Sequence, residues 1–256
     1  GLVKQSLPLI EQARKEGVDV TCDQYPYIAS ATSLTSIIPG RAHEGGPAAL
    51  LARLKDPEVS KRLKEDVAKS QGGGGWSKYL ITGVRSEKNS FAQGKRIPEI
   101  AAIWGISEVE TAWRLLIEEE LEVGEARFGM CEEDVKYVMA HPLVMIGSDS
   151  SCMAVDGPLA KGHPHPRTFG TFPRVLGRYC RDEAVFPLEK AVYKMTGMAA
   201  WRVGLWDRGL IRPGMKADLT LFDPGAVIDT ATFEAPLAYP KGIEKVWVNG
   251  ALKVAV

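Results

Sequence analysis

The sequence has no excess of either charge. Its 256 residues include 32 Lys and Arg and 32 Asp and Glu, which gives a formal net charge of zero. Nucleic-acid partners and membrane surfaces both select proteins with a basic excess, so the balance argues against both. We therefore expect a small-molecule ligand, with any charge selectivity confined to a local site.

A long apolar run and a leader pattern are also missing. No stretch approaches the roughly 18 apolar residues that indicate a membrane span. The first residues, Gly1-Leu-Val-Lys-Gln, lack the charged segment and long apolar segment of a secretory signal. The chain does not begin with Met, which suggests residues upstream, although trimming would look the same.

Cysteine pairs with metal or redox spacing are absent. The four cysteines form no CxxC pair and have no regular spacing; they are Cys22, Cys131, Cys152 and Cys180. This usage favours reduced thiols in a cytoplasmic protein over structural disulfides or a Cys-only zinc site.

What is present is an alternation of helix and strand. Ser6–Glu16 has apolar residues on one face, Gly17 ends that helix, and Val18–Asp23 is rich in β-branched residues. The continuous apolar run Leu143–Gly147, between Pro142 and Ser148, has the length of a buried parallel strand. The pattern predicts an α/β fold.

The other expected elements complete this picture. Tyr79–Thr82 is a short strand candidate, and the glycine run Gly72–Gly75 is a flexible loop, because it lacks the GK[ST] ending of a phosphate cradle. After about residue 206 the pattern becomes one of strands and turns, with Asn249-Gly250 as a two-residue hairpin signal. Helices are expected over 47–70, 96–104, 107–120, 131–141, 172–182 and 187–198, and a long loop over 150–170.

The sharpest chemical feature is Asp149, which follows Gly147-Ser148 at the end of the buried strand. In a (β/α)8 barrel, residues at the carboxyl ends of strands point into the active site. A carboxylate there binds a metal ion or moves the proton of a metal-bound water. The alternative is an Asp that caps the next helix or turn.

Two further stretches carry candidate groups. His163 and His165 have the HxH spacing of a metal pair, although they lie in a proline-rich loop instead of a strand end. Arg167 is suited to hold a substrate carboxylate, or else anchors the loop. At the first strand end, Asp23 is a site carboxylate or orients a ligand, and Tyr25 and Tyr27 wall a pocket or pack in the core.

The ordered set of motifs resembles the carboxyl-terminal part of the N-acyl-D-amino-acid deacylases (D-aminoacylases) of the amidohydrolase superfamily. Each motif alone is weak, whereas the order is specific and spans nearly the whole chain. The matching segments are Gly17–Tyr27, Pro142–Ser150, His165–Gly177, Lys194–Gly197, Asp207–Gly214, Ala217–Pro224 and Val248–Gly250.

The resemblance implies about the last three strand–helix units of a (β/α)8 barrel in residues 1–205, and part of a small β-sandwich in residues 206–256. It implies zinc-dependent hydrolysis of an N-acyl-D-amino acid. Asp149 matches the family's aspartate at the end of the eighth strand, which is the general base and then the acid, and a possible zinc ligand. Arg167, Tyr25 and Ser148 are assigned to substrate binding.

The sequence departs from the family in its metal ligands. The family's HxH pair on the first strand, its Cys and its His on the fifth strand have no counterpart here, so we expect them upstream of residue 1. Val18–Asp23 would be the sixth strand and Tyr79–Thr82 the seventh. In some members the sixth strand ends in a His ligand where this chain has Tyr25, and a phenol with a pKa of about 10 is a poor zinc ligand.

Several alternatives stay open. The chain could belong to an enzyme that opens cyclic amides, such as a hydantoinase or dihydroorotase, or could be a non-catalytic subunit or remnant. We expect these 256 residues alone to be inactive. For an acidic substrate side chain, Arg85 and Lys88 are candidate cations, with surface placement as the alternative.

Overall fold

The computed structural model describes residues 2–71 and 75–255, so most of the expected glycine loop, Gly72 to Gly74, lies outside the described residues. Two compact units share the chain. Unit 1 comprises Gly1–Ile28, Met130–Val155 and Pro166–Val256, and unit 2 comprises Ala29–Gly129 and Asp156–His165. The expected division into the carboxyl-terminal part of a barrel, residues 1–205, and a β-sandwich segment, residues 206–256, stays a prediction.

Unit 1 is built on two parallel strands, β1 (Cys22–Gln24) and β5 (Val144–Ile146). They pair in register from Cys22 opposite Val144 to Gln24 opposite Ile146. All three residues of β5 are buried, as expected for a parallel strand with both faces covered. The expected buried strand is therefore confirmed.

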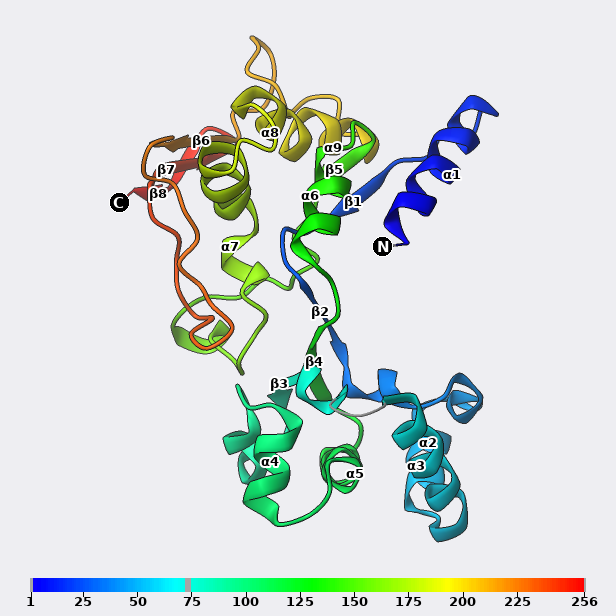
Figure 1. Ribbon diagram of the computed structural model, residues 1–256. Coiled ribbons are helices and arrows are strands. Elements are labelled where there is room, and N and C mark those ends of the chain that lie inside the picture. Colours follow the sequence, from blue (N-terminus) through cyan, green and yellow to red (C-terminus); the bar gives the residue numbers. More distant parts are fainter. Residues whose placement is uncertain (1, 72–74, 256) are drawn as a thin grey trace. The chain divides into compact units, whose positions relative to one another are not determined.

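Helices surround this pair in unit 1 (Figure 1). β5 contacts α6 (Glu132–Ala140), α8 (Leu188–Met195) and α9 (Gly197–Arg202), and α6 contacts α1 (Val3–Lys15). The core includes Met139, Ile146, Val175, Tyr179, Phe186, Ala191 and Val227. The expected first helix is confirmed, within a few residues at its start.

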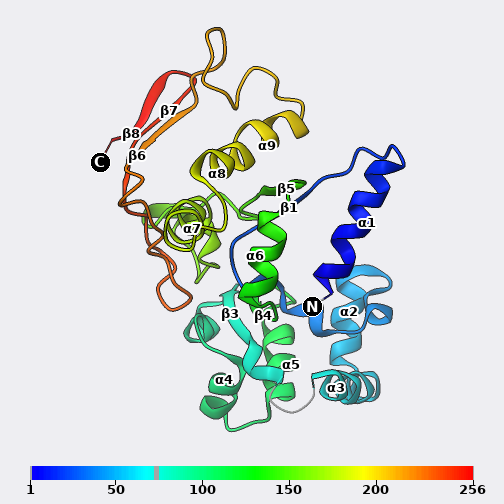
Figure 2. The same cartoon turned by 45° about the horizontal axis from the view of Figure 1, so that its top comes forward.

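The carboxyl-terminal part of unit 1 begins with α7 (Arg167–Arg174), which continues as a π-helix over Val175–Asp182. It ends in an antiparallel sheet of β6 (Leu219–Phe222), β7 (Ile243–Val248) and β8 (Ala251–Ala255), which run side by side in Figure 2. Asn249 and Gly250 join the last two strands with φ of 50° and 78°. These left-handed values are those of a type I′ turn, so the predicted hairpin is confirmed.

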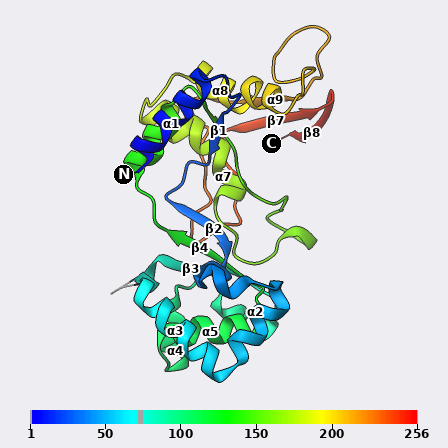
Figure 3. The same ribbon diagram turned by 90° about the vertical axis from the view of Figure 1, so that its right-hand side faces the viewer.

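Unit 2 contains a second antiparallel sheet with the order β2 (Ala29–Ser33), β4 (Val123–Phe128), β3 (Tyr79–Val84). Figure 3 shows its helices gathered on one side of the sheet. They are α2 (Gly46–Lys55), α3 (Pro57–Gln71), α4 (Ile97–Trp104) and α5 (Glu108–Glu118). The predicted helices in these regions are confirmed. Short 3-10 helices cover Leu34–Ile37, Gly40–His43, Gly75–Lys78, Glu87–Ala92 and, in the loop after β5, Gly157–Leu159.

The strand numbering expected from the sequence is wrong. Tyr79–Thr82 lies in β3, which pairs antiparallel with β4 in unit 2, so it is no barrel strand between β1 and β5. β1 instead pairs directly with β5. If β5 is the eighth strand of a barrel, its neighbour β1 is the seventh, and the comparison of Tyr25 with a sixth-strand His no longer applies. Among the described residues the parallel sheet thus has two strands where three units were expected.

A short apolar run does not encode the direction of its partner. Tyr79, Leu80 and Ile81 are buried in β3 as they would be in a parallel strand. The sequence does not predict the partner strand β4, because Glu125 and Arg127 interrupt its apolar pattern. Within residues 2–71 and 75–255, no helix has the length and apolar character needed to cross a membrane.

Candidate active site

Asp149 lies just beyond the carboxyl end of β5, after Gly147 and Ser148. Its backbone is left-handed, with φ of 47°, a conformation that non-glycine residues adopt mainly in turns and functional sites. Its side chain is 71% exposed, and its Oδ2 lies 2.9 Å from Nη2 of Arg167. Helix α7 begins at Arg167 with Pro166 as its N-cap residue. Asp149 thus pairs with a cation at the strand end.

Arg167 belongs to a third segment, the start of α7, and contacts both Asp149 and Tyr25. It is the first residue of α7, only 7% exposed, and its guanidinium carbon lies 4.5 Å from the centre of the Tyr25 ring. Tyr25 directly follows β1. Because β1 and β5 are parallel, their carboxyl ends meet at one edge, and α7 starts there too. The structure therefore brings together three of the four predicted site residues.

The electrostatics keep these groups in defined states. The guanidinium of Arg167 supplies the positive charge of the cluster. Burial raises the pKa of Tyr25; the Arg167 cation and its hydrogen bond oppose this, and Asp149 adds to it. Tyr25 is therefore a neutral phenol near pH 7 and keeps its proton for donation.

The loop that carries Asp149 is tied to α7 by a second contact. Ser150 Oγ and Thr168 Oγ1 are 2.7 Å apart. Ser148, the fourth predicted residue, is half-buried between Gly147 and Asp149. Asp23, on β1, has its carboxylate close to Gly147, where an added Cβ would lie 3.2 Å from Asp23 Oδ2.

The HxH pair belongs to unit 2 and packs there. His165 is buried, and its Nε2 lies 3.0 Å from the carbonyl oxygen of Ala29. The backbone N–H of His163 donates to the carbonyl oxygen of Thr82 at 2.7 Å, and its ring lies against Gly94. These contacts favour a role in anchoring the loop over residues 156–165 to unit 2.

Asp149 offers one carboxylate to a metal ion. Across residues 2–71 and 75–255, no group of three or more His, Cys, Asp and Glu is arranged to hold a metal. The donor chemistry of Asp149 fits zinc as a single oxygen ligand. Further metal ligands would have to come from residues other than 2–71 and 75–255.

Arg85 and Lys88 are surface residues of unit 2. Arg85 pairs with Glu120, and Lys88 Nζ lies 3.0 Å from Glu118 Oε1. Both cations are more than half exposed. The alternative of surface placement is therefore the one that the structure favours.

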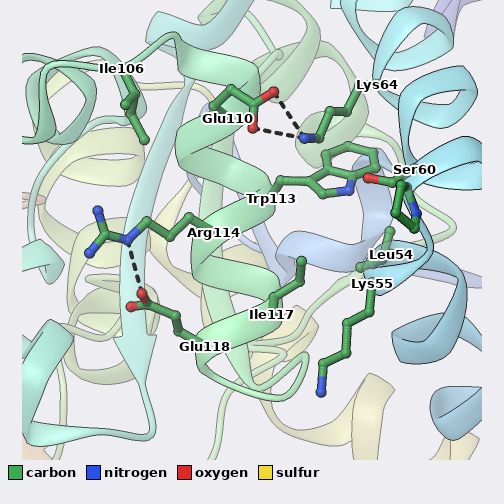
Figure 4. Close-up of a pocket in the computed structure, with 11 residues that line it drawn as sticks. Leu54, Lys55, Ser60, Lys64, Ile106, Glu110, Trp113, Arg114, Ile117 and Glu118 are labelled. Carbon is green, nitrogen blue, oxygen red and sulfur yellow. Dashed lines mark hydrogen bonds and ion pairs between the residues drawn. The ribbon is translucent and has the colours of Figure 1, made fainter.

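Unit 2 also has an open groove of about 620 Å³ between α3 and α5 (Figure 4). The Trp113 ring lines it, and Lys64 Nζ lies 2.7 and 2.9 Å from the two carboxylate oxygens of Glu110. Arg114 Nε is 2.9 Å from Glu118. Both cations are engaged by acids of α5, and none of the predicted site residues lines this groove. The candidate active site is therefore the strand-end cluster of unit 1.

Comparisons with known proteins point to one family. The model of the amidohydrolase family matches residues 13–253. The chain is 38% identical to a D-aminoacylase from Alcaligenes xylosoxydans xylosoxydans, over 98% of this chain and 42% of that protein. It is 43% identical to an N-acyl-D-aspartate deacylase of the same organism, over 76% of this chain and 35% of that protein.

A solved structure is similar in fold as well. It is the N-acyl-D-glutamate deacylase from Bordetella bronchiseptica, complexed with zinc and a phosphonate inhibitor that mimics the tetrahedral intermediate. The TM-score is 0.74 at 34% identity, over 98% of this chain and 43% of that one. The chain thus spans about two fifths of the length of such relatives.

Proposed function

The chain belongs to the amidohydrolase family, and from this premise we propose that it is the carboxyl-terminal part of a zinc-dependent N-acyl-D-amino-acid deacylase. The reaction splits the amide bond of the substrate into a carboxylate and a free D-amino acid. The observation that carries the proposal is the cluster of Asp149, Arg167 and Tyr25 at the ends of β1 and β5.

The cluster suits the two functional groups of such a substrate. An N-acyl amino acid has a permanent α-carboxylate and an amide a few atoms away. Arg167 is a buried, fixed cation that can hold the carboxylate through two N–H groups, and Tyr25 offers a neutral O–H beside it. Ser148 contributes a hydroxyl from the same loop.

Asp149 is the proton carrier of the proposed reaction. Its exposed carboxylate accepts a proton from the attacking water and then delivers it to the amine nitrogen that leaves. When bound, zinc polarises the amide carbonyl and lowers the pKa of the water. In the substrate-free chain Asp149 pairs with Arg167. A substrate carboxylate bound to Arg167 would compete for that cation and free Asp149 for proton transfer.

The finer fold and the place in the cell belong to the same proposal. β1 and β5 are parallel, short and flanked by helices, as the seventh and eighth strands of a (β/α)8 barrel would be. The sheet β6–β8 would be the chain's share of a small β-sandwich. All four cysteines are free thiols, which supports a cytoplasmic location.

A chimera tests the proposed activity. The part of the Alcaligenes D-aminoacylase that this chain does not match is joined to the chain, and the protein is loaded with zinc. We expect hydrolysis of N-acetyl-D-amino acids but not of hydantoin or dihydroorotate. We expect Asp149→Asn to lower kcat by about a hundredfold or more, the usual effect of losing a general base.

The outcomes separate the alternatives. A zinc-loaded chimera that opens the cyclic amides and leaves the acyl-D-amino acids intact would favour the cyclic-amide enzymes. A folded chimera without any turnover would favour a non-catalytic subunit or remnant. The 256-residue chain assayed alone with excess zinc is expected to be inactive, and rapid turnover by it would refute the fragment proposal.

A further inference from the structure

A buried polar network in unit 1 lies next to the candidate active site. It comprises Arg174 at the end of α7, Tyr27 two residues after Tyr25, and Asp229 in the segment between β6 and β7. None of these three side chains carries a role in the function proposed above. Their hydrogen bonds reach residues that flank both Tyr25 and Arg167.

Arg174 holds the turn that carries Tyr25. Its Nε donates to the carbonyl oxygen of Pro26 at 2.9 Å, and its Nη1 lies 3.0 Å from Asp229 Oδ2. Its guanidinium carbon also lies 4.7 Å from the centre of the Tyr27 ring. The cation thus holds the Pro26–Tyr27 peptide, one residue beyond Tyr25, and is itself held by Asp229 and the Tyr27 ring.

Tyr27 makes the matching connection to Arg167. Its hydroxyl lies 3.4 Å from the carbonyl oxygen of Pro166, the residue before Arg167, and 3.5 Å from Asp229 Oδ2. Tyr27 is 3% exposed, and burial raises its pKa, so the hydroxyl keeps its proton and donates. One side chain therefore links the segment of Tyr25 to the segment of Arg167.

Asp229 completes the network as a buried anion. Its side chain is only 6% exposed, and it faces the Arg174 cation and the Tyr27 hydroxyl. Removing one partner of a buried ion pair leaves the other charge unpaired, so the three groups act as a unit. The backbone of Ile228, the residue before Asp229, also forms an antiparallel bridge with Lys241, and this bridge holds the segment that carries Asp229.

The packing around the network leaves little freedom. A Cβ added at Gly170 of α7 would lie 2.3 Å from the Tyr27 hydroxyl and 2.9 Å from Asp229 Cβ. No side chain fits at that distance, so α7 approaches the network through a glycine. Helix α7, which starts with Arg167, therefore packs directly against Tyr27 and Asp229.

We propose that Tyr27, Arg174 and Asp229 are positioning residues for substrate binding: they hold the peptides beside Tyr25 and Arg167 so that the phenol and the guanidinium stay stacked and face the substrate carboxylate together. Arg174 acts on Tyr25 through Pro26, and Tyr27 acts on Arg167 through Pro166. The inference rests on the proposed function, because it needs a carboxylate substrate at this cluster.

The test compares two substrates in the zinc-loaded chimera. One is an N-acetyl-D-amino acid, and the other is its neutral carboxamide, which offers no anion to Arg167. The variants are Tyr27→Phe, which removes one hydroxyl, Arg174→Lys and Asp229→Asn. Arg202→Lys is the matched control, because Arg202 also belongs to unit 1 and also pairs with an aspartate, Asp19, which is not part of this network.

We expect each of the three variants to raise KM for the carboxylate substrate about tenfold, which corresponds to about 1.4 kcal/mol. We expect kcat to change by less than about threefold, and kcat/KM for the carboxamide to stay unchanged, since only carboxylate binding is disturbed. The control variant should leave KM and kcat unchanged for both substrates.

Three results would overturn the inference. Equal losses on the two substrates would show a general structural defect instead of positioning. Unchanged KM values in Tyr27→Phe and Arg174→Lys would show that the network does not act on the binding pair. An unmodified chimera that hydrolyses neither substrate would refute the proposed function first, and the positioning role with it.

Discussion

Glu125 should make the stability of unit 2 depend on pH in a range where most carboxylates have already ionised. It lies on β4, the central strand of its sheet, opposite Thr32 and Ile81, and it is fully buried. Ser36 Oγ donates to its Oε1 at 3.1 Å, and among the described residues its Oε2 has no hydrogen-bond partner. Burial raises its pKa to about 7, although Ser36 and the charge of Arg127 oppose the shift.

The direction of the effect follows from the raised pKa. The protonated form is favoured in the folded state, so its stabilisation is fully present below the unfolded pKa of 4.5 and is lost as the pH rises through about 7. At 1.36 kcal/mol for each pH unit between these values, the loss is about 3 kcal/mol. Glu125→Gln stays neutral and can keep an acceptor oxygen for Ser36, so its stability should lack this decline.

Urea unfolding between pH 4 and pH 8 measures the difference. Replacing Trp201, Trp206 and Trp247 of unit 1 with Phe leaves only the tryptophans of unit 2 to report. We call the protein with these three replacements the parent. Between pH 4 and pH 8 its free energy of unfolding should fall by about 3 kcal/mol relative to the same protein with Glu125→Gln. Glu122→Gln, which replaces an exposed acid next to β4, should behave like the parent. A stability difference between the parent and Glu125→Gln that stays constant with pH would refute the reasoning.

Two further predictions concern unit 1. Lys194 is 1% exposed and donates to the carbonyl oxygens of His141 and Val144 at 2.5 and 2.6 Å, and burial lowers its pKa to about 8. Because the folded pKa lies below the unfolded 10.5, stability should rise between pH 8 and pH 10.5 relative to Lys194→Met, and thermal unfolding across this range checks it. Gly170→Ala should destabilise unit 1 by about 1–3 kcal/mol through overpacking against Tyr27, as measured by urea unfolding. Gly225→Ala is the control in the same unit and should cost less, because its Cβ would meet only the side-chain carboxylate of Asp223, at 3.3 Å.

The sequence by itself determined the local features of this protein. The buried run before Asp149 predicted a parallel strand, because only a strand covered on both faces is apolar at every position. Asn249-Gly250 predicted the last hairpin, because few residues accept two left-handed conformations in succession. The order of motifs predicted the family, and the strand end predicted where Asp149 would lie.

Tertiary structure alone decided which segments meet. The direction of β3 depends on its partner β4, and a six-residue run reads the same in either case. Arg174 reaches Pro26 across 148 positions of sequence, and Asp229 lies 55 positions beyond Arg174, so no periodic pattern connects them. His165 and Arg167 are two residues apart, yet they belong to different units because each is held by its own long-range contact. Periodicity records which faces are buried, whereas the choice of partner depends on packing between distant segments.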